Sequence, residues 1–481
     1  MAMQTYIGLD FGTTHVKAGL FDGDGTLLQL ERVPTPTQPD PLGPVYDPRE
    51  VASLLKELLG RLRLPSTRPR GIVVTGMAEA GLALEKASGN PISPIIPWYD
   101  RRTLSYAQQV TLEADRERFC VTGLRNSFKY GIYKYRWVLE HGNHPAEGTV
   151  WLSAVDYVVY LLTGQMVTEP TFADRTYAYH LETGDFDLSF LEKWGLSREN
   201  FPRLIPSGAA AGSCCLPGWE GVPVCIGAHD HVCAAFGMDQ AAGQGICDSC
   251  GTAETYLGRL AQRPLTQKDF DTGCCFGPFP GGGLFWMGNI SASGLSVEWY
   301  RTKGSGQLSY ETLNTWLEEN REPTGILYFP ALTGLGTPCC RQTFPATFLG
   351  LEAHHDNRDM LRAVVEGLGY QGRLVLEAAG APELPVLSVG GATESPGWMQ
   401  RKADILGRQV LTLAQKEATL TGAVTLMVFC QQGAPEAARF ARGMTLGAQY
   451  APDPRRQTLY EEGYRRYRHW YRVILGGLEK E

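Results

Sequence analysis

The sequence predicts an α/β protein of two domains, each with a mixed sheet flanked by helices. Three observations lead to this fold class. The chain has 481 residues, enough for two or three domains. Strand-like runs alternate with runs of helical spacing along most of it. A strand, glycine turn and strand at the start recur near residue 250. We expect domains at 1–240 and 241–481, with a cleft between them.

The first domain is predicted to open with an antiparallel meander whose strands are joined by glycine turns. A helix with Val51, Leu55 and Leu58 on one face then covers the sheet. A later apolar segment, which ends at Gly164, is predicted to be helical from its first residue. The expected strands are Thr5–Asp10, His15–Phe21, Thr26–Leu30 and Gly71–Gly76, and the expected helices are Asp47–Leu62 and Trp151–Leu162.

The second domain is predicted to repeat the opening pattern. Gly245–Gly258 is again a strand, a Gly-Thr turn and a strand, and it resembles Leu9–Thr14 with its flanking strands, so we infer an internal duplication. The last helix carries tyrosines at helical spacing, which is typical of a core face. The remaining expected elements are strands at Gly325–Pro330 and Val386–Val389 and helices at Asp359–Ala378, Pro396–Gly407, Gly422–Gln432 and Asp453–Leu475.

Composition excludes several classes of protein. Hydrophobic residues make up 43%, which is ordinary for a globular protein, and 44 basic against 51 acidic residues leave a net charge of -7. An acidic chain does not favour a nucleic-acid partner. No apolar run reaches the ~18 residues of a membrane span, and no secretion signal is visible, so we expect a cytoplasmic protein without a membrane partner. The 12 cysteines, Cys247 and Cys250 among them, are expected to be structural thiols.

The segment Asp10–Thr14 has the chemistry of a phosphate site. A carboxylate at the end of a strand, followed by a turn rich in N–H groups and threonine hydroxyls, can hold a phosphate with Mg²⁺ beside it. A strand follows and not a helix, so this is no P-loop. An ordinary turn is the plainer interpretation. The second copy at Gly251 and Thr252 favours the site, since two such turns from two domains can face one polyphosphate.

Two further segments are candidates for chemistry. Gly390 and Gly391 end a strand before a helix, where backbone can approach a planar ligand or a phosphate, although a tight turn would use the same residues. Asp230 lies between His229 and His231 where a buried strand meets a helix, the position of an N-cap. An ionised carboxylate there can accept a proton from a hydroxyl. The alternatives are a plain cap and, less favoured, a metal site with both histidines.

Taken in this order, the segments resemble the FGGY family of carbohydrate kinases, a branch of the actin-like ATPase superfamily. Ile7–Thr14 is similar to that family's first phosphate motif and Gly251–Ala253 to its second. Gly390–Ala392, together with Ser395 and Trp398, resembles its nucleotide signature. The resemblance runs from Tyr6 to about Gly422. It implies two actin-like, ribonuclease H-like domains with ATP and a sugar in the cleft between them.

The resemblance also implies roles for individual residues. Asp230 would be the general base and Asp10 would help to hold Mg²⁺. The nucleotide side would comprise Gly12, Thr13, Thr14, Lys17, Gly251, Thr252, Gly294, Gly390, Gly391, Ala392 and Ser395. The sugar side would comprise Glu79, Trp98, Asp100, Arg102, His229, Asp230 and His231. A homodimer is what the family suggests for the assembly.

The expected reaction is transfer of the γ-phosphate of ATP to a hydroxyl of a small sugar. A histidine directly before the base looks more like the kinases of 6-deoxyketoses, so a ketose, either xylulose-like or 6-deoxy, or a related polyol is the expected acceptor. Two alternatives stay open at this point. One is a gluconate or polyol kinase, and the other is an actin-like regulatory protein that binds a nucleotide without phosphotransfer.

Overall fold

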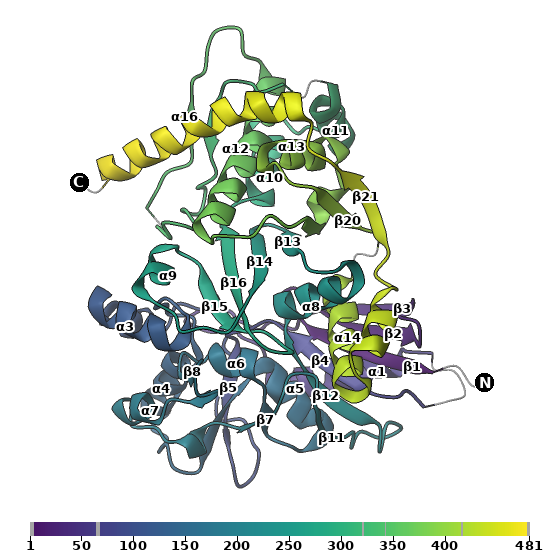
Figure 1. The fold of residues 1–481 in the computed structure, drawn as a ribbon. Coiled ribbons are helices and arrows are strands. Elements are labelled where there is room, and N and C mark those ends of the chain that lie inside the picture. Colours follow the sequence, from purple (N-terminus) through teal and green to yellow (C-terminus); the bar gives the residue numbers. More distant parts are fainter. Residues whose placement is uncertain (1–3, 64–67, 320–321, 342, 415–416, 479–481) are drawn as a thin grey trace.

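Two large mixed sheets form the frame of the molecule, one above the other in Figure 1, and this confirms the predicted α/β class with two domains. The computed structural model describes residues 4–63, 68–319, 322–341, 343–414 and 417–478. The predicted division between residues 240 and 241 falls in the last turn of helix α8 (Asp230–Ala242).

The first sheet has six strands and contains the predicted opening meander. Central strand β1 runs parallel to β4, which runs parallel to β12, so the carboxyl ends of these three strands lie at one edge of the sheet. In spatial order the strands are β11 (Ala210–Ser213), β12 (Pro223–His229), β4 (Ile72–Gly76), β1 (Thr5–Phe11), β2 (His15–Asp22) and β3 (Leu27–Pro34).

The second sheet repeats this arrangement, which agrees with the predicted duplication. Strand β13 pairs antiparallel with β14 and parallel with β19, just as β1 pairs with β2 and β4. One further strand, β15, extends the edge. The order is β15 (Cys275–Pro278), β16 (Leu284–Ile290), β14 (Glu254–Leu260), β13 (Ile246–Cys250), β19 (Val386–Val389), β20 (Val410–Leu413) and β21 (Leu446–Tyr450).

Two apolar helices, α8 and α14 (Ala418–Gln432), lie between the sheets. Their core includes Val73 and Cys225 from the first sheet and Cys247 and Leu387 from the second. Helix α14 comes from the second half of the chain and yet packs on β1, β4 and β12 of the first sheet. Because both sheets bury apolar faces against one helical layer, the two halves of the chain share a core.

Close approach of α8 and α14 explains why the predicted start of the second helix, Gly422, was wrong. The helix begins four residues earlier, at Ala418, and Gly422 lies inside it. A Cβ on Gly422 would lie 1.9 Å from the carbonyl oxygen of Cys233 on α8. The glycine therefore marks a helix contact and not a helix boundary.

Another correction concerns the predicted helix Trp151–Leu162. Its first residues belong to strand β6 (Thr149–Ser153), which pairs with β5 (Gly81–Glu85). Ser153 forms a capping box with Asp156, so helix α5 runs only over Ala154–Thr163 and ends, as predicted, at a left-handed Gly164. A continuous apolar run hides this boundary, because buried strands and buried helices have the same composition.

Outer helices cover the faces of the sheets turned away from α8 and α14. Helices α1 and α5 pack on the first sheet, α12 and α13 pack on the second, and α16 lies across α12 and α13 (Figure 1). Tyr460, Tyr464, Tyr467 and Tyr471 of α16 are buried, as the aromatic spacing predicted. The bounds are α1 (Pro48–Gly60), α12 (Asn357–Ala378), α13 (Pro396–Leu406) and α16 (Pro454–Leu478).

The remaining helices and strands of each half lie outside the two large sheets. In the first they are α2 (Leu104–Gln108), α3 (Leu112–Thr122), α4 (Gly131–His141), β7 (Val167–Thr168), α6 (Pro170–Asp174), β8 (Tyr179–His180), β9 (Asp185–Phe186), α7 (Leu188–Lys193) and β10 (Arg203–Leu204). In the second they are α9 (Gln267–Asp271), α10 (Gly294–Trp299), α11 (Tyr310–Glu319), β17 (Leu327–Phe329), β18 (Thr347–Leu349) and α15 (Ala434–Ala441). None of the described helices is long and apolar enough to cross a membrane.

Candidate functional site

The carboxyl edge of the first sheet brings two predicted acids together. Asp10 lies near the end of β1, opposite Thr75 of β4, and His229 ends β12 opposite Gly76. Asp230 follows directly as the first residue of α8, so the N-cap is His229 and not Asp230 as the sequence suggested. Because β1, β4 and β12 are parallel and end at the same edge, the carboxylates of Asp10 and Asp230 lie close together.

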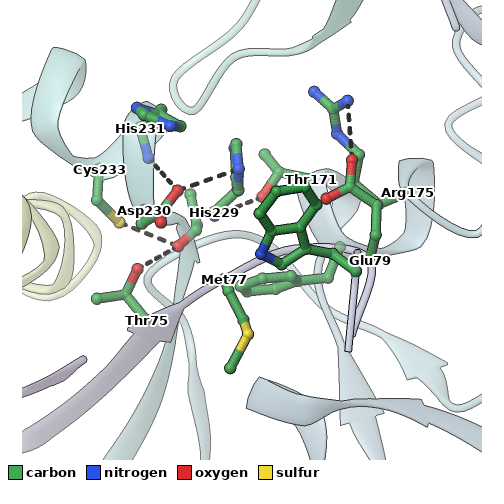
Figure 2. A network of polar contacts seen from close by, with 12 residues as sticks. Thr75, Met77, Glu79, Thr171, Arg175, His229, Asp230, His231 and Cys233 are labelled. Carbon is green, nitrogen blue, oxygen red and sulfur yellow. Dashed lines mark hydrogen bonds and ion pairs between the residues drawn. The ribbon is translucent and has the colours of Figure 1, made fainter. Parts of the chain in front are cut away.

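Asp230 is held by its two histidine neighbours, as Figure 2 shows. The Nε2 atom of His229 lies 3.1 Å from Oδ1 of Asp230, and the backbone N–H of His231 donates to the same oxygen at 2.6 Å. The N–H of His229 donates in turn to the hydroxyl of Thr171. The Asp230 side chain keeps 29% of its surface exposed, so it is fixed in direction and accessible.

Electrostatics around Asp230 favour a base. Burial raises the pKa of Asp230, and the charge of His231 only partly opposes this. Burial, helped by Arg175 and His231, holds the pKa of His229 well below its ordinary value. His229 is therefore neutral at neutral pH and does not act as a cation beside Asp230.

Asp10 has the properties of a cation ligand. Burial, reinforced by the charge of Asp230, raises its pKa to about 7, while Lys17 opposes the rise. Its Oδ1 atom is buried and has no hydrogen-bond partner among the residues that the structure describes. A buried carboxylate that lacks a donor and faces a second carboxylate fits the oxygen ligands that Mg²⁺ prefers.

The first of the two predicted phosphate turns, Gly12–Thr14, is tight. The N–H of Gly12 donates to the carbonyl of His15, and a Cβ on Gly12 would lie 2.8 Å from that oxygen. Thr14 is exposed and the Thr13 hydroxyl accepts a hydrogen bond from Nε1 of Trp98 at 3.0 Å. The turn therefore contacts a predicted sugar-side residue directly.

Lys17 is placed beside this turn but already has a partner. Its Nζ lies 2.8 Å from Glu417, the N-cap residue of α14. Glu417 was not singled out in the sequence, because nothing in its neighbourhood marks it as a partner of a residue 400 positions away.

The predicted nucleotide-side segments meet at the second phosphate turn. The N–H of Gly294 donates to the carbonyl of Gly251, and a Cβ on Gly294 would lie 2.5 Å from that oxygen. Gly390 has φ +102° and would place a Cβ 2.4 Å from the carbonyl oxygen of Cys250. Only glycine allows these backbones to come so close. The turn residues Gly251 and Thr252 stay exposed.

The neighbouring strand end supplies the rest of this region. Gly390 and Gly391 are exposed and Ala392 is half-buried. A short 3₁₀ turn, Gly391–Glu394, begins at the second glycine of the pair and leads to α13. The sequence predicted α13 but not this turn. Ser395 precedes α13, and its Oγ is buried without a hydrogen-bond partner among the described residues. That free hydroxyl is available to a ligand or a water molecule.

On the sugar side, Glu79 lies within a group of cations. Its Oε1 is 3.1 Å from Nζ of Lys129 and 3.5 Å from the guanidinium of Arg175. Burial by itself would raise the pKa of Glu79, but these two cations outweigh it and hold the pKa below its ordinary value. Glu79 and Arg175 are also close enough to shift the pKa of Asp230, so this group borders the base.

Asp100 and Arg102 are placed differently from Glu79. They form a two-pronged ion pair with each other, at 2.9 Å for both contacts, and Arg102 also reaches Asp40. Both side chains are almost fully buried. Trp98, in contrast, is 41% exposed. Trp98 thus lies beside the Gly12–Thr14 turn, whereas Asp100 and Arg102 are partners of each other.

With this geometry established, the comparisons with known proteins can be weighed. Models of the N-terminal and C-terminal domains of the FGGY carbohydrate kinases match residues 5–237 and 248–429. The chain belongs to the FGGY family of carbohydrate kinases. It is an ATP-dependent phosphotransferase, as the motifs predicted.

Curated relatives of this FGGY kinase include two glycerol kinases. The one from Thermus brockianus is 29% identical over 88% of this chain and 89% of its own length. The one from Alkalilimnicola ehrlichii is 27% identical over 88% and 90%. Each match therefore spans most of this chain and most of the glycerol kinase.

Solved structures share the fold of this kinase. The xylulose kinase from Lactobacillus acidophilus has a TM-score of 0.89 and 18% identity, with 99% of each chain covered. The gluconate kinase from the same organism has a TM-score of 0.88 and 18% identity over 98% of each chain. The xylulose kinase from Rhodospirillum rubrum has a TM-score of 0.86 and 24% identity, covering 99% of this chain and 100% of its own. At these identities the likeness establishes the fold.

Several residues of the kinase site were missed in the sequence. Lys134 of α4 is fully buried and donates to the carbonyls of Glu79 at 2.6 Å and Pro97 at 2.7 Å. A charged residue among the buried positions of a helix is a signal that could have found it. Lys129 and Arg175 carried no such signal, because they come from a loop and a short helix end that only the fold brings to Glu79.

Proposed function

We propose that this kinase transfers the γ-phosphate of ATP to a hydroxyl of a small ketose, xylulose-like or 6-deoxy, or a related polyol, with Asp230 as the general base. The observation that carries the proposal is the placement of Asp230. Its carboxylate is accessible, lies 3.1 Å from Nε2 of a neutral His229, and lies beside Asp10, whose Oδ1 has no hydrogen-bond partner among the described residues. An acid in this setting is suited to accept a proton.

The proposed step conserves atoms and charge. The acceptor hydroxyl gives its proton to Asp230 while its oxygen bonds to the γ-phosphorus, and the bond from that phosphorus to the β,γ-bridging oxygen breaks to release ADP. Asp10 would help to hold Mg²⁺, which neutralises phosphate charge when bound. The turns at Gly12–Thr14 and Gly251–Thr252 would donate N–H groups to the phosphates.

The remaining proposed roles follow the same division. Gly390, Gly391, Ala392 and Ser395 would border the adenosine, with Gly294 holding the second turn in place. Glu79, Trp98 and His231 would contact the sugar. For Asp100 and Arg102 we propose an indirect role, since their ion pair fixes the loop that carries Trp98.

Two other acceptors have specific support. The curated relatives are named glycerol kinases, which favours a short polyol. Arg175 favours a sugar acid such as gluconate. Its terminal nitrogens are buried, and their described contacts are Glu79 at 3.5 Å and the sulfur of Cys275 at 3.8 and 3.9 Å. A guanidinium with such weak acceptors suits a carboxylate. The chain's membership in a kinase family speaks against the regulatory alternative without phosphotransfer.

The test is ATP consumption with Mg²⁺ across xylulose, rhamnulose, glycerol and gluconate, for the native protein and Asp230→Asn. We expect one acceptor to raise turnover strongly and the variant to lose about 10²- to 10⁴-fold in kcat. Asp239→Asn, an acid at the far end of the same helix, is the matched control and should keep full activity. Unchanged turnover in Asp230→Asn would contradict the assignment of the base.

A further inference from the structure

A fully buried lysine lies beneath the second phosphate turn. Lys402 comes from α13, and its Nζ lies 2.6 Å from Oδ2 of Asp248, 3.0 Å from Oε1 of Glu254 and 3.1 Å from the sulfur of Cys250. Asp248 and Cys250 precede the turn on β13, and Glu254 follows it on β14. The ammonium group of Lys402 therefore contacts side chains from both strands of the hairpin, β13 and β14.

The same network reaches the other nucleotide-side segments. Ser388, two residues before Gly390, donates to Asp248 at 2.6 Å. Ser293, which directly precedes Gly294, donates to Glu254 at 2.5 Å. All of these side chains are at most 2% exposed. The segments that carry Gly251, Gly294 and Gly390 thus converge on a single ammonium group.

Lys402 also explains a cluster that would otherwise suggest a metal. Asp248, Cys250 and Glu254 have ligand atoms within 4.8 Å of one another. The lysine is already in contact with all three, and the two acids raise its pKa well above the ordinary value although burial opposes this. The ammonium group of Lys402 occupies the position that a metal ion would need between Asp248, Cys250 and Glu254.

We propose that Lys402 is a positioning residue for the nucleotide, which holds the Gly251–Thr252 turn at the distance and angle that phosphate binding requires. The turn itself is exposed, and its carbonyls accept hydrogen bonds from the N–H groups of Ser293, Gly294 and Leu295. That segment is in turn linked to Lys402, because Ser293 donates to Glu254 and Glu254 contacts the lysine. Without the lysine, two buried acids face each other at the base of the hairpin, and like charges in a buried site repel. The strands would separate and the turn would move.

The inference rests on the proposed function, because it assigns phosphates to this turn. The test is calorimetric binding of ADP with Mg²⁺, which needs no knowledge of the sugar. We expect Lys402→Met to weaken ADP binding by about tenfold or more, since small displacements of binding groups are costly. Ser388→Ala, which removes one link and leaves the ion pairs, should weaken it by a smaller factor. The KM for the sugar should stay within about twofold of native.

Arg401→Met is the matched control. Arg401 is the adjacent residue of α13 and is equally buried, but it donates to the carbonyls of Leu317 and Gly397 away from the hairpin. We expect it to lower thermal stability and leave the Kd of ADP unchanged. This comparison separates a positioning role from a general loss of folding, and Ser388→Ala covers the case in which Lys402→Met does not fold.

The outcomes are distinct. Equal ADP binding by native protein, Lys402→Met and Ser388→Ala overturns this inference and leaves the proposed function intact. Equal losses in Lys402→Met and Arg401→Met overturn it too, since the effect is then one of stability. Failure of the native protein to bind ADP contradicts the proposed function, and this inference with it.

Discussion

The proposed sugar side and the proposed nucleotide side of this kinase each contain a buried lysine, and the two lysines have opposite surroundings. Lys134 donates to two backbone carbonyls, and its burial lowers its pKa to about 7, although Glu79 and Asp100 oppose this. Lys402 lies between two carboxylates, and its pKa rises. A buried ammonium keeps its proton where carboxylates are its direct partners and loses it more easily where its direct partners are backbone carbonyls.

This difference has a consequence for pH. Near neutral pH the lysine of the sugar side is close to its titration midpoint, while that of the nucleotide side stays charged. The two halves should therefore respond differently to the same substitution and to the same change of pH.

Among variants that separate the two sides, the largest effect on the sugar is expected from Lys134→Met. The carbonyls of Glu79 and Pro97 would each lose a donor, at a cost of about 1–3 kcal/mol per buried group. The loops that carry Glu79 and Trp98 should loosen, and the KM for the sugar should rise about tenfold while ADP binding stays native. Steady-state kinetics and calorimetry measure both. A loss of ADP affinity equal to the loss for the sugar would show that the two sides are not independent.

The contributions of Lys134 and Lys402 to the free energy of unfolding should depend differently on pH. For Lys134 the folded-state pKa of about 7 lies below the unfolded value, so between pH 7 and 10 the unfolded chain binds more protons at this site. Its contribution to stability therefore increases with pH, by up to about 1.4 kcal/mol per unit. For Lys402 the pKa is raised, so its contribution is constant below the unfolded pKa and declines only at higher pH.

Urea unfolding of native protein, Lys134→Met and Lys402→Met at pH 7, 8.5 and 10 tests this. The difference in unfolding free energy between native protein and Lys134→Met should change with pH in favour of the native protein. Parallel curves for all three proteins would show that Lys134 has an ordinary pKa.

A smaller effect is expected at the contact between the sides. Trp98→Phe keeps an aromatic ring but removes the Nε1–H that donates to Thr13, a bond worth about 0.5–1.5 kcal/mol. The KM values for sugar and ATP should both rise, by about threefold. Trp470→Phe, at a tryptophan of α16 with similar exposure, should be neutral. If only the KM for the sugar rises and the KM for ATP does not, Trp98 acts on the sugar side only.

The smallest effect is expected for the ion pair that joins the two halves of the chain. Lys17 and Glu417 are partly exposed, and such pairs contribute about 0.2–1 kcal/mol. In a cycle of Lys17→Met, Glu417→Gln and the double variant, ADP affinity should show a coupling of this size that shrinks at high salt. Strict additivity would mean that Lys17 acts on the nucleotide without Glu417.

Much of the frame was predictable because it depends on local pattern. Alternating strands, glycine turns and the repeat of the turn gave the class of fold and its duplication. Asp10 and Asp230 were singled out because Asp10 lies near the end of one buried strand and Asp230 follows another. The parallel pairing of β1, β4 and β12 brings them to a common edge. The errors came where local pattern is ambiguous, as in the apolar run at Trp151 and in the glycine at 422.

The supporting charges were not predictable in this way. Lys134, Arg175 and Lys402 have partners that are 37 to 154 residues away or lie in other elements. A lysine among the apolar positions of a helix, such as Lys134, can be recognised as buried from the sequence, but the sequence does not show which groups face it.

By itself, the sequence determined the two α/β domains, the repeated glycine turns and the family, and it singled out the candidate base, since these follow from periodicity and from short motifs. The tertiary structure alone decided which cations hold the turns and how the acids near the base titrate. The physical reason is that burial and charge pairing depend on distances in space, and long-range packing sets those distances.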